Sequence, residues 1–333
     1  MKYFWLIILP IVTAGSLHAQ LFESDTPLKL TLNFDYTYVI KDRGERPLAY
    51  PAIMNYTDAD GQERSIKLKI RTRGHSRKQH DVCEFPPLLF KFDDDDVEKT
   101  IFAEQRDLKL VTHCRNARKY SDLVVKEYLA YLGYSALTDH SFRVRPVEIT
   151  YQDFRGKDRT TRHGFFIEEE KQLRKRLELK KLDADERDEV APDPVGLARI
   201  ALYNYYIGNT DWSTEEPHNL ETFRTRGDAQ HLVYVPYDFD WAGLVNAPYA
   251  RPQSVYGTKS VTERVVPREC LNEAAVREVL SEMRERRELL DAMIGNEGSL
   301  RSREQQRLVG FLQQFWRETE QPEFVKRFVA NCE

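Results

Sequence analysis

The spacing of apolar residues changes near the middle of the chain, and this change constrains the fold more than any other feature. Residues 28–35 and 65–73 alternate apolar and polar side chains with period two, as half-buried β-strands do. From Pro194 onward, apolar residues recur every three or four positions, as on the buried face of a helix. One helical stretch, 120–137, interrupts the first half. The pattern predicts an α+β protein with a strand-rich first lobe containing one helix and a mainly helical second lobe.

The first twenty residues predict export from the cytoplasm. Lys2 precedes an apolar stretch over 3–12, and small residues follow up to Ala19. This order is typical of a secretory signal peptide, and the apolar run is short for a membrane span. We therefore expect a periplasmic, extracellular or cell-surface protein with no transmembrane segment after cleavage. An uncleaved anchor is the alternative.

The remaining domain boundaries follow from composition. Residues 171–193 are dense in charged side chains, as in a solvated connector. We divide the chain into a signal peptide, a strand-rich lobe, a charged connector and a mainly helical lobe with the metal and catalytic loops, with bounds 1–19, 20–170, 171–193 and 194–333.

The charge balance argues against a nucleic-acid-binding protein. Lys plus Arg number 50 and Asp plus Glu number 54, and the net charge is −4. Such a chain lacks the strongly basic field that attracts a phosphate backbone. We therefore expect no nucleic-acid partner.

Four cysteines fit an exported chain with disulfides. Three pairings are possible among them, and proximity along the chain favours Cys83 with Cys114 and Cys270 with Cys332. Free buried thiols are the alternative. Zinc is disfavoured because no two cysteines have the spacing of zinc ligands.

Polar residues at the ends of apolar segments of the second half predict a phosphotransfer site. Asp211 follows an apolar run that ends at Ile207, and Asp238 and Asp240 follow an apolar strand. Carboxylate and amide oxygens, including that of Asn219, suit magnesium on a phosphate chain, and Asp211 suits a base for an acceptor hydroxyl. Asp238 and Asp240 are the predicted charged ligands. The alternative is that these residues only cap loops and turns.

A second group in the first half has the chemistry to hold phosphates. A strand runs into Arg73, Gly74 and Ser76, whose backbone N–H groups and guanidinium suit phosphate oxygens. Lys91 on the next strand could reach the α and β phosphates, and Glu168 ends a later strand where a hinge between lobes would begin. An exposed basic turn and a solvent-facing lysine are the alternatives.

Taken in order, these segments resemble the spore-coat protein H (CotH) family of atypical, secreted or surface-associated protein kinases. The similarity covers roughly residues 65–245. The segments that carry it are Arg71-Thr-Arg-Gly-His-Ser, Leu108-Lys-Leu-Val, the helix with Leu123 to Leu132, Phe142-Arg-Val-Arg, Gly164-Phe-Phe-Ile-Glu, Asn209-Thr-Asp, His218-Asn219 and Val235-Pro-Tyr-Asp-Phe-Asp-Trp.

The resemblance implies a two-lobed protein-kinase-like fold that binds ATP with Mg²⁺ (or Mn²⁺) and phosphorylates a Ser or Thr of a protein substrate. It implies Asp211 as the catalytic aspartate and Asn219 and Asp238 as metal ligands, with Arg73, Gly74 and Ser76 in a turn on the phosphate side. Asn219 follows Asp211 by eight residues, whereas protein kinases place the equivalent residue five after.

Two other functions remain open at this stage. A catalytically inactive protein that binds the envelope or cell surface is one, on account of the longer loop and the aromatic residues Tyr249 and Tyr256. A metal-dependent hydrolase using Asp238 and Asp240 with His113 or His163 is the other, although the eight histidines are scattered rather than spaced as metal ligands. Metal-dependent binding of ATP separates the kinase from the inactive protein.

Overall fold

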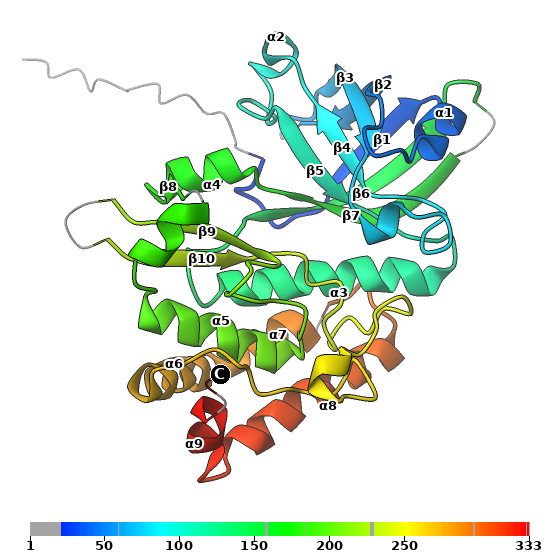
Figure 1. Ribbon diagram of the computed structural model, residues 1–333. Helices are drawn as coiled ribbons and strands as arrows, with labels where there is room; N and C mark the ends of the chain where they lie inside the picture. The colour runs from blue at the N-terminus through cyan, green and yellow to red at the C-terminus, as the bar shows by residue number, and fades with distance from the viewer. Residues whose placement is uncertain are drawn as a thin grey trace, which may run out of the picture.

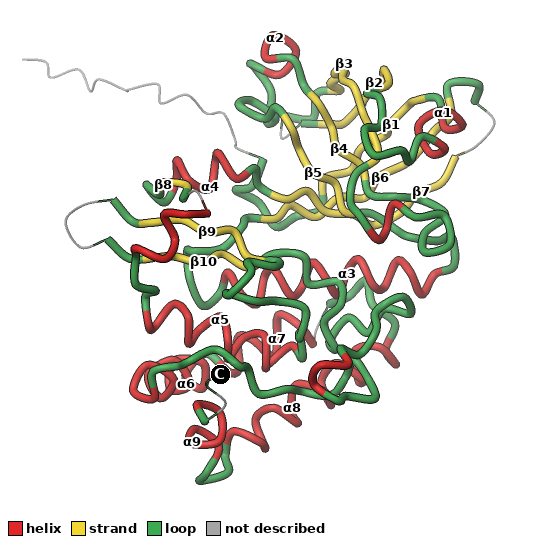
Figure 2. The backbone as a smooth tube through the Cα atoms, viewed as in Figure 1, coloured by secondary structure: helices red, strands yellow, loops and turns green. Residues whose placement is uncertain are grey.

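The computed structural model describes seven stretches of the chain, namely residues 21–58, 60–156, 159–182, 184–226, 230–295, 297–330 and 332. The predicted signal peptide lies outside these residues. Within them, most strands gather in one part of the molecule and most helices in another, as the two views show (Figures 1 and 2).

Seven strands of the described residues close into a barrel in the order β1-β2-β3-β4-β5-β7-β6. Most neighbours are antiparallel, but β1 runs parallel to β6, with Leu28 beside Val147 and Phe34 beside Asp153. Inward-facing apolar residues alternate with outward-facing ones along the strands and form the barrel core. The strands are β1 (Leu28–Phe34), β2 (Tyr50–Thr57), β3 (Glu63–Thr72), β4 (Leu88–Lys91), β5 (Asp107–Val111), β6 (Val144–Asp153) and β7 (Arg159–Ile167).

The expected α+β, two-lobed protein-kinase-like fold is wrong. The strand-rich part is a closed, mixed seven-stranded barrel, and it carries the short helices α1 (Tyr36–Lys41) and α2 (Asp94–Val97) besides the expected long helix. A second sheet lies among the helices of the other part. The physical reason is the pairing of β1 with β6, which removes both free edges of the first sheet. Alternation within a strand predicts its buried face but not its partner more than a hundred residues away.

The second part of the molecule combines helices with a three-stranded sheet in the order β10-β9-β8. Its strands are β8 (Lys180–Lys181), β9 (Leu220–Arg224) and β10 (Leu232–Pro236). The predicted connector, 171–193, contains most of α4, all of β8 and a short 3-10 helix, η2. The helices are α4 (Glu170–Arg176), η2 (Ala184–Glu189), α5 (Pro194–Ile207), η3 (Ser254–Tyr256), α6 (Glu273–Glu285), α7 (Arg287–Gly295), α8 (Ser302–Thr319) and α9 (Phe324–Val329).

Helix α3 (Arg118–Ser135) joins the two parts. It crosses beneath the barrel in Figure 1, packing on β6 and β7 on one side and on α7 on the other. Most of its residues are buried, including the charged Lys126 and Glu127. A helix buried on several faces is hydrophobic around its circumference, so charged side chains buried there call for an explanation.

Both cysteine pairs favoured by chain proximity form disulfides, Cys83 with Cys114 and Cys270 with Cys332, so this prediction is confirmed. Disulfides of this kind are typical of proteins in oxidising compartments outside the cytoplasm. Among the described residues, no helix combines the length and apolar character needed to cross a membrane.

Candidate functional site

A crevice opens where the barrel, α3 and the segment after β10 meet. It encloses about 320 Å³, its open mouth included. Three cationic side chains and two carboxylates line it, together with aromatic and aliphatic groups. The lining residues are Arg73, Arg77, Lys109, Val111, Glu127, Tyr131, Phe142, Ile167, Tyr237 and Asp238. Cationic and acidic groups gathered in one crevice suit an anionic ligand and a metal cation together.

The end of α5 delivers Asp211 to the site. Gly208 ends the helix in the left-handed conformation at φ 64°, which glycine adopts without a steric penalty. The chain then turns, and the side chain of Asn209 holds it by accepting a hydrogen bond from the Asp211 N–H at 3.1 Å. The Asn209 carboxamide is itself fixed by a 2.9 Å bond to Asn204 on α5.

The carboxylate of Asp211 has a hydrogen-bond partner on each oxygen. Nδ2 of Asn219 donates to Oδ2 at 3.0 Å and to the Asp211 carbonyl at 2.8 Å. Oδ1 lies 3.1 Å from Nε2 of His218 and accepts from Nε2 of Gln253 at 3.2 Å. Burial raises the pKa of Asp211, the pairing with His218 opposes this, and the charge of Asp238 adds to the rise. Asp211 and Asn219 are thus brought together as the sequence predicts.

Asp238 enters the crevice directly after β10. Its backbone N–H donates to the hydroxyl of Tyr131 on α3 at 2.8 Å, and its side chain is 44% exposed. Both Asp238 (φ 59°) and Asn219 (φ 53°) have positive φ angles, which few residues other than glycine adopt. Strained backbone of this kind clusters at functional sites, so its presence at two candidate ligands supports their assignment.

A buried arginine at the end of the basic turn, expected on the phosphate side, pairs instead with the carboxylates of the crevice. The guanidinium of Arg77 lies 3.2 Å from Glu127, 3.2 Å from Asp240 and 3.7 Å from Asp238. Burial opposes its charge, but Glu127 and Asp240 outweigh that effect and hold the pKa of Arg77 well above its ordinary value. Burial raises the pKa of Glu127 to about 7 and that of Asp240 well above its usual range. Burial also raises the pKa of the nearby Tyr249, and the charge of Asp240 adds to the rise.

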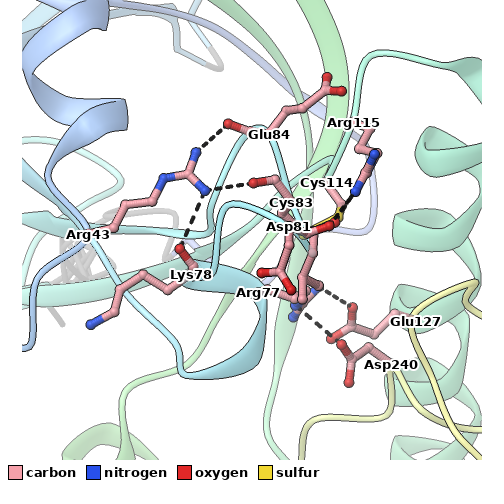
Figure 3. Close-up of a disulfide and its surroundings, with 11 residues drawn as sticks. Arg43, Arg77, Lys78, Asp81, Cys83, Glu84, Cys114, Arg115, Glu127 and Asp240 are labelled. Carbon is pink, nitrogen blue, oxygen red and sulfur yellow. Dashed lines mark hydrogen bonds and ion pairs between the residues drawn. A yellow bond between two sulfur atoms is a disulfide. The ribbon is translucent and has the colours of Figure 1, made fainter.

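The β3–β4 loop (residues 73–87) that carries this arginine is fastened on both sides. The disulfide from Cys83 to Cys114 joins it to the segment after β5. Arg43 donates to three backbone carbonyls of the loop, one at 2.6 Å, and Arg115 donates to two others at 2.5 and 3.2 Å. Figure 3 shows these arginines on either side of the loop, with the buried arginine reaching toward the carboxylates of α3 and of the segment after β10.

Two further cations stand on the barrel side of the crevice. Arg73 leaves the end of β3, with its N–H bonded to the carbonyl of Pro87 at 2.9 Å. Lys109 projects from β5 and lies 5.9 Å from the ring centre of Tyr237. Burial lowers the pKa of both side chains, and the carboxylate of Asp238 opposes this in each case. An anion bound between them would stabilise their two positive charges, which burial otherwise disfavours.

Four predicted phosphate-side residues lie away from the crevice lining. Lys91 pairs with Asp107 on the barrel surface, Nζ to Oδ1 at 2.6 Å, with both side chains about half exposed. Glu168 is buried, and the guanidinium of Arg176 holds both its oxygens at 2.8 and 3.1 Å. Gly74 is exposed with φ 89°, and Ser76 begins the short helix η1 (Ser76–Lys78). Of the predicted phosphate-side residues, Arg73 alone is among the crevice-lining residues.

The arrangement fits a magnesium ion held by Asp238 and Asn219. Asn219 turns its amide nitrogen to Asp211, which leaves its carboxamide oxygen for a metal. A divalent cation would also offset the repulsion between Asp211 and Asp238. Asp240 is different, because it is 4% exposed and forms an ion pair with Arg77. Among the described residues, no three His, Cys, Asp or Glu side chains form a metal-binding group of their own.

The hydrolase hypothesis placed a histidine beside Asp238, and neither candidate lines the crevice. His113 is buried in the barrel, stacked 4.6 Å from the ring centre of Phe85, and burial lowers its pKa to about 3. His163 lines a separate groove with the start of α3.

The functional residues that sequence reasoning missed carry one shared signal, a charge inside an apolar pattern. Lys109 interrupts the strand sequence Leu-Lys-Leu-Val, and Glu127 lies within the apolar surface of α3. Neither charge is expected in a core unless it has a partner or a function.

Comparison with known proteins adds no relative. No family model matches the chain, and a search of curated proteins finds no match. The function therefore has to be argued from the geometry of the crevice.

Proposed function

We propose that the protein is an exported, magnesium-dependent phosphotransferase of the kind found in the spore-coat protein H (CotH) family. Its donor would be ATP, and its acceptor a serine or threonine hydroxyl of a protein. The proposal concerns the chemistry of the crevice and does not depend on a kinase-like arrangement of the two parts.

One observation carries the proposal. Asp238 lines the crevice opposite Arg73 and Lys109, and the paired Asp211 and Asn219, from two other segments, lie near enough for the charge of Asp238 to raise the pKa of Asp211. Loop caps and turn residues would have no reason to converge beside two desolvated cations. A phosphate chain with its metal ion requires both kinds of group within a few ångströms of each other.

Each residue has a role that follows from its charge and surroundings. Arg73 and Lys109 would bind phosphate oxygens, where the anion compensates the burial of their charges. Asp238 and Asn219 would hold the metal ion, which when bound neutralises charge on the β and γ phosphates. Asp211, with its raised pKa, would take the proton of the acceptor hydroxyl. Arg77 holds Glu127 and Asp240 in place and so keeps the floor of the site rigid.

The two lysines provide a direct test of this assignment. Lys109→Ala should weaken the binding of Mg–ATP about 10- to 100-fold, as expected for the loss of one charged contact. Lys91→Ala removes the same kind of side chain from the barrel surface and should leave binding unchanged. Calorimetric titration of both variants measures the difference. Equal affinities for the two variants would contradict the proposed phosphate site.

A further inference from the structure

The segment that follows Asp238 and Asp240 folds back toward these carboxylates and Asp211. We call residues 246–257 the strap; it is drawn in yellow in Figure 1. Tyr249 of the strap lies near Asp240, whose charge helps to raise its pKa, and Gln253 donates to Oδ1 of Asp211 at 3.2 Å. On its outer side, Arg268 donates to the carbonyl of Val255 at 3.0 Å. The strap therefore contacts Asp211 through Gln253 and brings a second side chain near Asp240.

The three groups on the Asp211 carboxylate are not held equally well. Asn219 makes two hydrogen bonds to Asp211, and the backbone of His218 pairs with Ser213 in both directions, at 3.1 and 3.3 Å. Gln253 reaches the carboxylate from a loop 42 residues away. Among the described residues, its side chain makes this hydrogen bond alone. The side chains of Gln253 and His218 each make a single hydrogen bond among the described residues, both to Oδ1 of Asp211, so Gln253 can leave that oxygen without breaking another side-chain hydrogen bond.

The carboxamide also has the chemistry of an acceptor. Its N–H donates to Oδ1 of Asp211 as the O–H of a substrate would before transfer. An acceptor hydroxyl cannot form this hydrogen bond from the same direction while Gln253 is in place.

We propose that Gln253 occupies the acceptor position of the site and is displaced by the hydroxyl group that receives the phosphoryl group. The inference rests on the proposed phosphotransferase function and adds how the acceptor is admitted. In the transfer, a bond forms between the acceptor oxygen and the γ phosphorus, and the bond from that phosphorus to the β–γ bridging oxygen breaks. ADP leaves with that electron pair, and the acceptor proton passes to Asp211.

The occupied acceptor position also has a consequence for water. Water is the smallest hydroxyl acceptor, and Gln253 excludes it from the side of Asp211 that it covers. The strap would in this way limit ATP hydrolysis when no protein acceptor is bound.

Hydrolysis of ATP by water is the test, because it needs no identified acceptor. Gln253→Ala should raise the rate about tenfold, the effect of releasing one hydrogen bond to a carboxylate, with the affinity for Mg–ATP unchanged. Gln253→Asn retains the amide on a side chain that is one methylene too short to reach Asp211. It should show the same increase in ATP hydrolysis while disturbing the strap least. Ser254→Ala is the matched control from the same loop, since Ser254 is exposed, and it should behave as the wild type.

The outcomes separate the two proposals. Normal Mg–ATP affinity with no increase in hydrolysis in either Gln253 variant would overturn the acceptor role of Gln253 and leave the phosphotransferase standing. An equal increase in Ser254→Ala would also overturn it, because the effect would then be a general loosening of the loop. A wild-type protein that does not bind Mg–ATP would overturn both.

Discussion

Removing the disulfide between Cys83 and Cys114 should disable the crevice, whereas removing the other disulfide should not. The first bond fastens the β3–β4 loop, which carries Arg73 and Arg77. It closes 31 residues, and the second bond closes 62. Loop-closure entropy grows only with the logarithm of this length, so each disulfide stabilises the folded state by about 4 kcal/mol. The two losses of stability are therefore nearly equal, and only the effect on the crevice differs.

The comparison uses two double variants, Cys83→Ser with Cys114→Ser and Cys270→Ser with Cys332→Ser. Urea titration measures the free energy of unfolding, and calorimetry at low temperature measures Mg–ATP affinity. Both variants should lose about 4 kcal/mol of stability. The first should in addition bind Mg–ATP about 100-fold more weakly, as expected when charged contacts to the phosphates are lost with the loop. If both variants kept full affinity, or lost it equally, the claim that this disulfide positions the crevice arginines would be refuted.

Three further predictions concern single residues. Burial lowers the pKa of His113 to about 3, so between that pH and about 6.5 the unfolded chain binds one more proton than the folded chain, and stability falls as the pH drops through this window. His113→Gln should therefore flatten the acid side of the curve of unfolding free energy against pH, measured by urea titration. An unchanged slope would contradict this. Burial lowers the pKa of Lys126 to about 8, so stability should rise as the pH increases from about 8 to 10.5, and Lys126→Met should lose that rise in the same assay. Asp211→Asn should keep Mg–ATP binding while phosphoryl transfer falls about 100-fold or more, and full transfer activity would show that Asp211 is not the base.

The sequence predicted the individual elements well because each has a local pattern. The alternation over 28–35 and 65–73 corresponds to β1 and β3, and the apolar spacing over 120–137 corresponds to α3. Gly61, in the turn between the antiparallel strands β2 and β3, has a positive φ angle of 76°, which glycine adopts readily. The closure of the barrel was missed because it depends on β1 meeting β6, and no local pattern encodes a contact across such a separation.

The candidate site shows the same division between local and distant information. Asp211 and Asp238 could be proposed from the sequence because each follows an apolar element, whereas Asn219 follows a polar stretch and was proposed for its carboxamide oxygen. The lysine of the crevice could not be predicted, because Lys91 and Lys109 both lie on strands and only the fold shows that Lys109 faces the crevice. The carboxamide of Gln253 lies in a loop without periodicity, so its approach to Asp211 is visible only in three dimensions.

The most direct test of the central claim is a calorimetric titration of the mature, oxidised protein with ATP, with and without Mg²⁺, beside Asp238→Ala. Asp107→Ala, which alters an exposed carboxylate on the barrel surface, is the matched control. We predict that the wild type and Asp107→Ala bind ATP only with Mg²⁺ present and that Asp238→Ala does not bind. Absence of binding in the wild type, or binding that survives the loss of Asp238, would contradict the assignment of this crevice as a magnesium–nucleotide site.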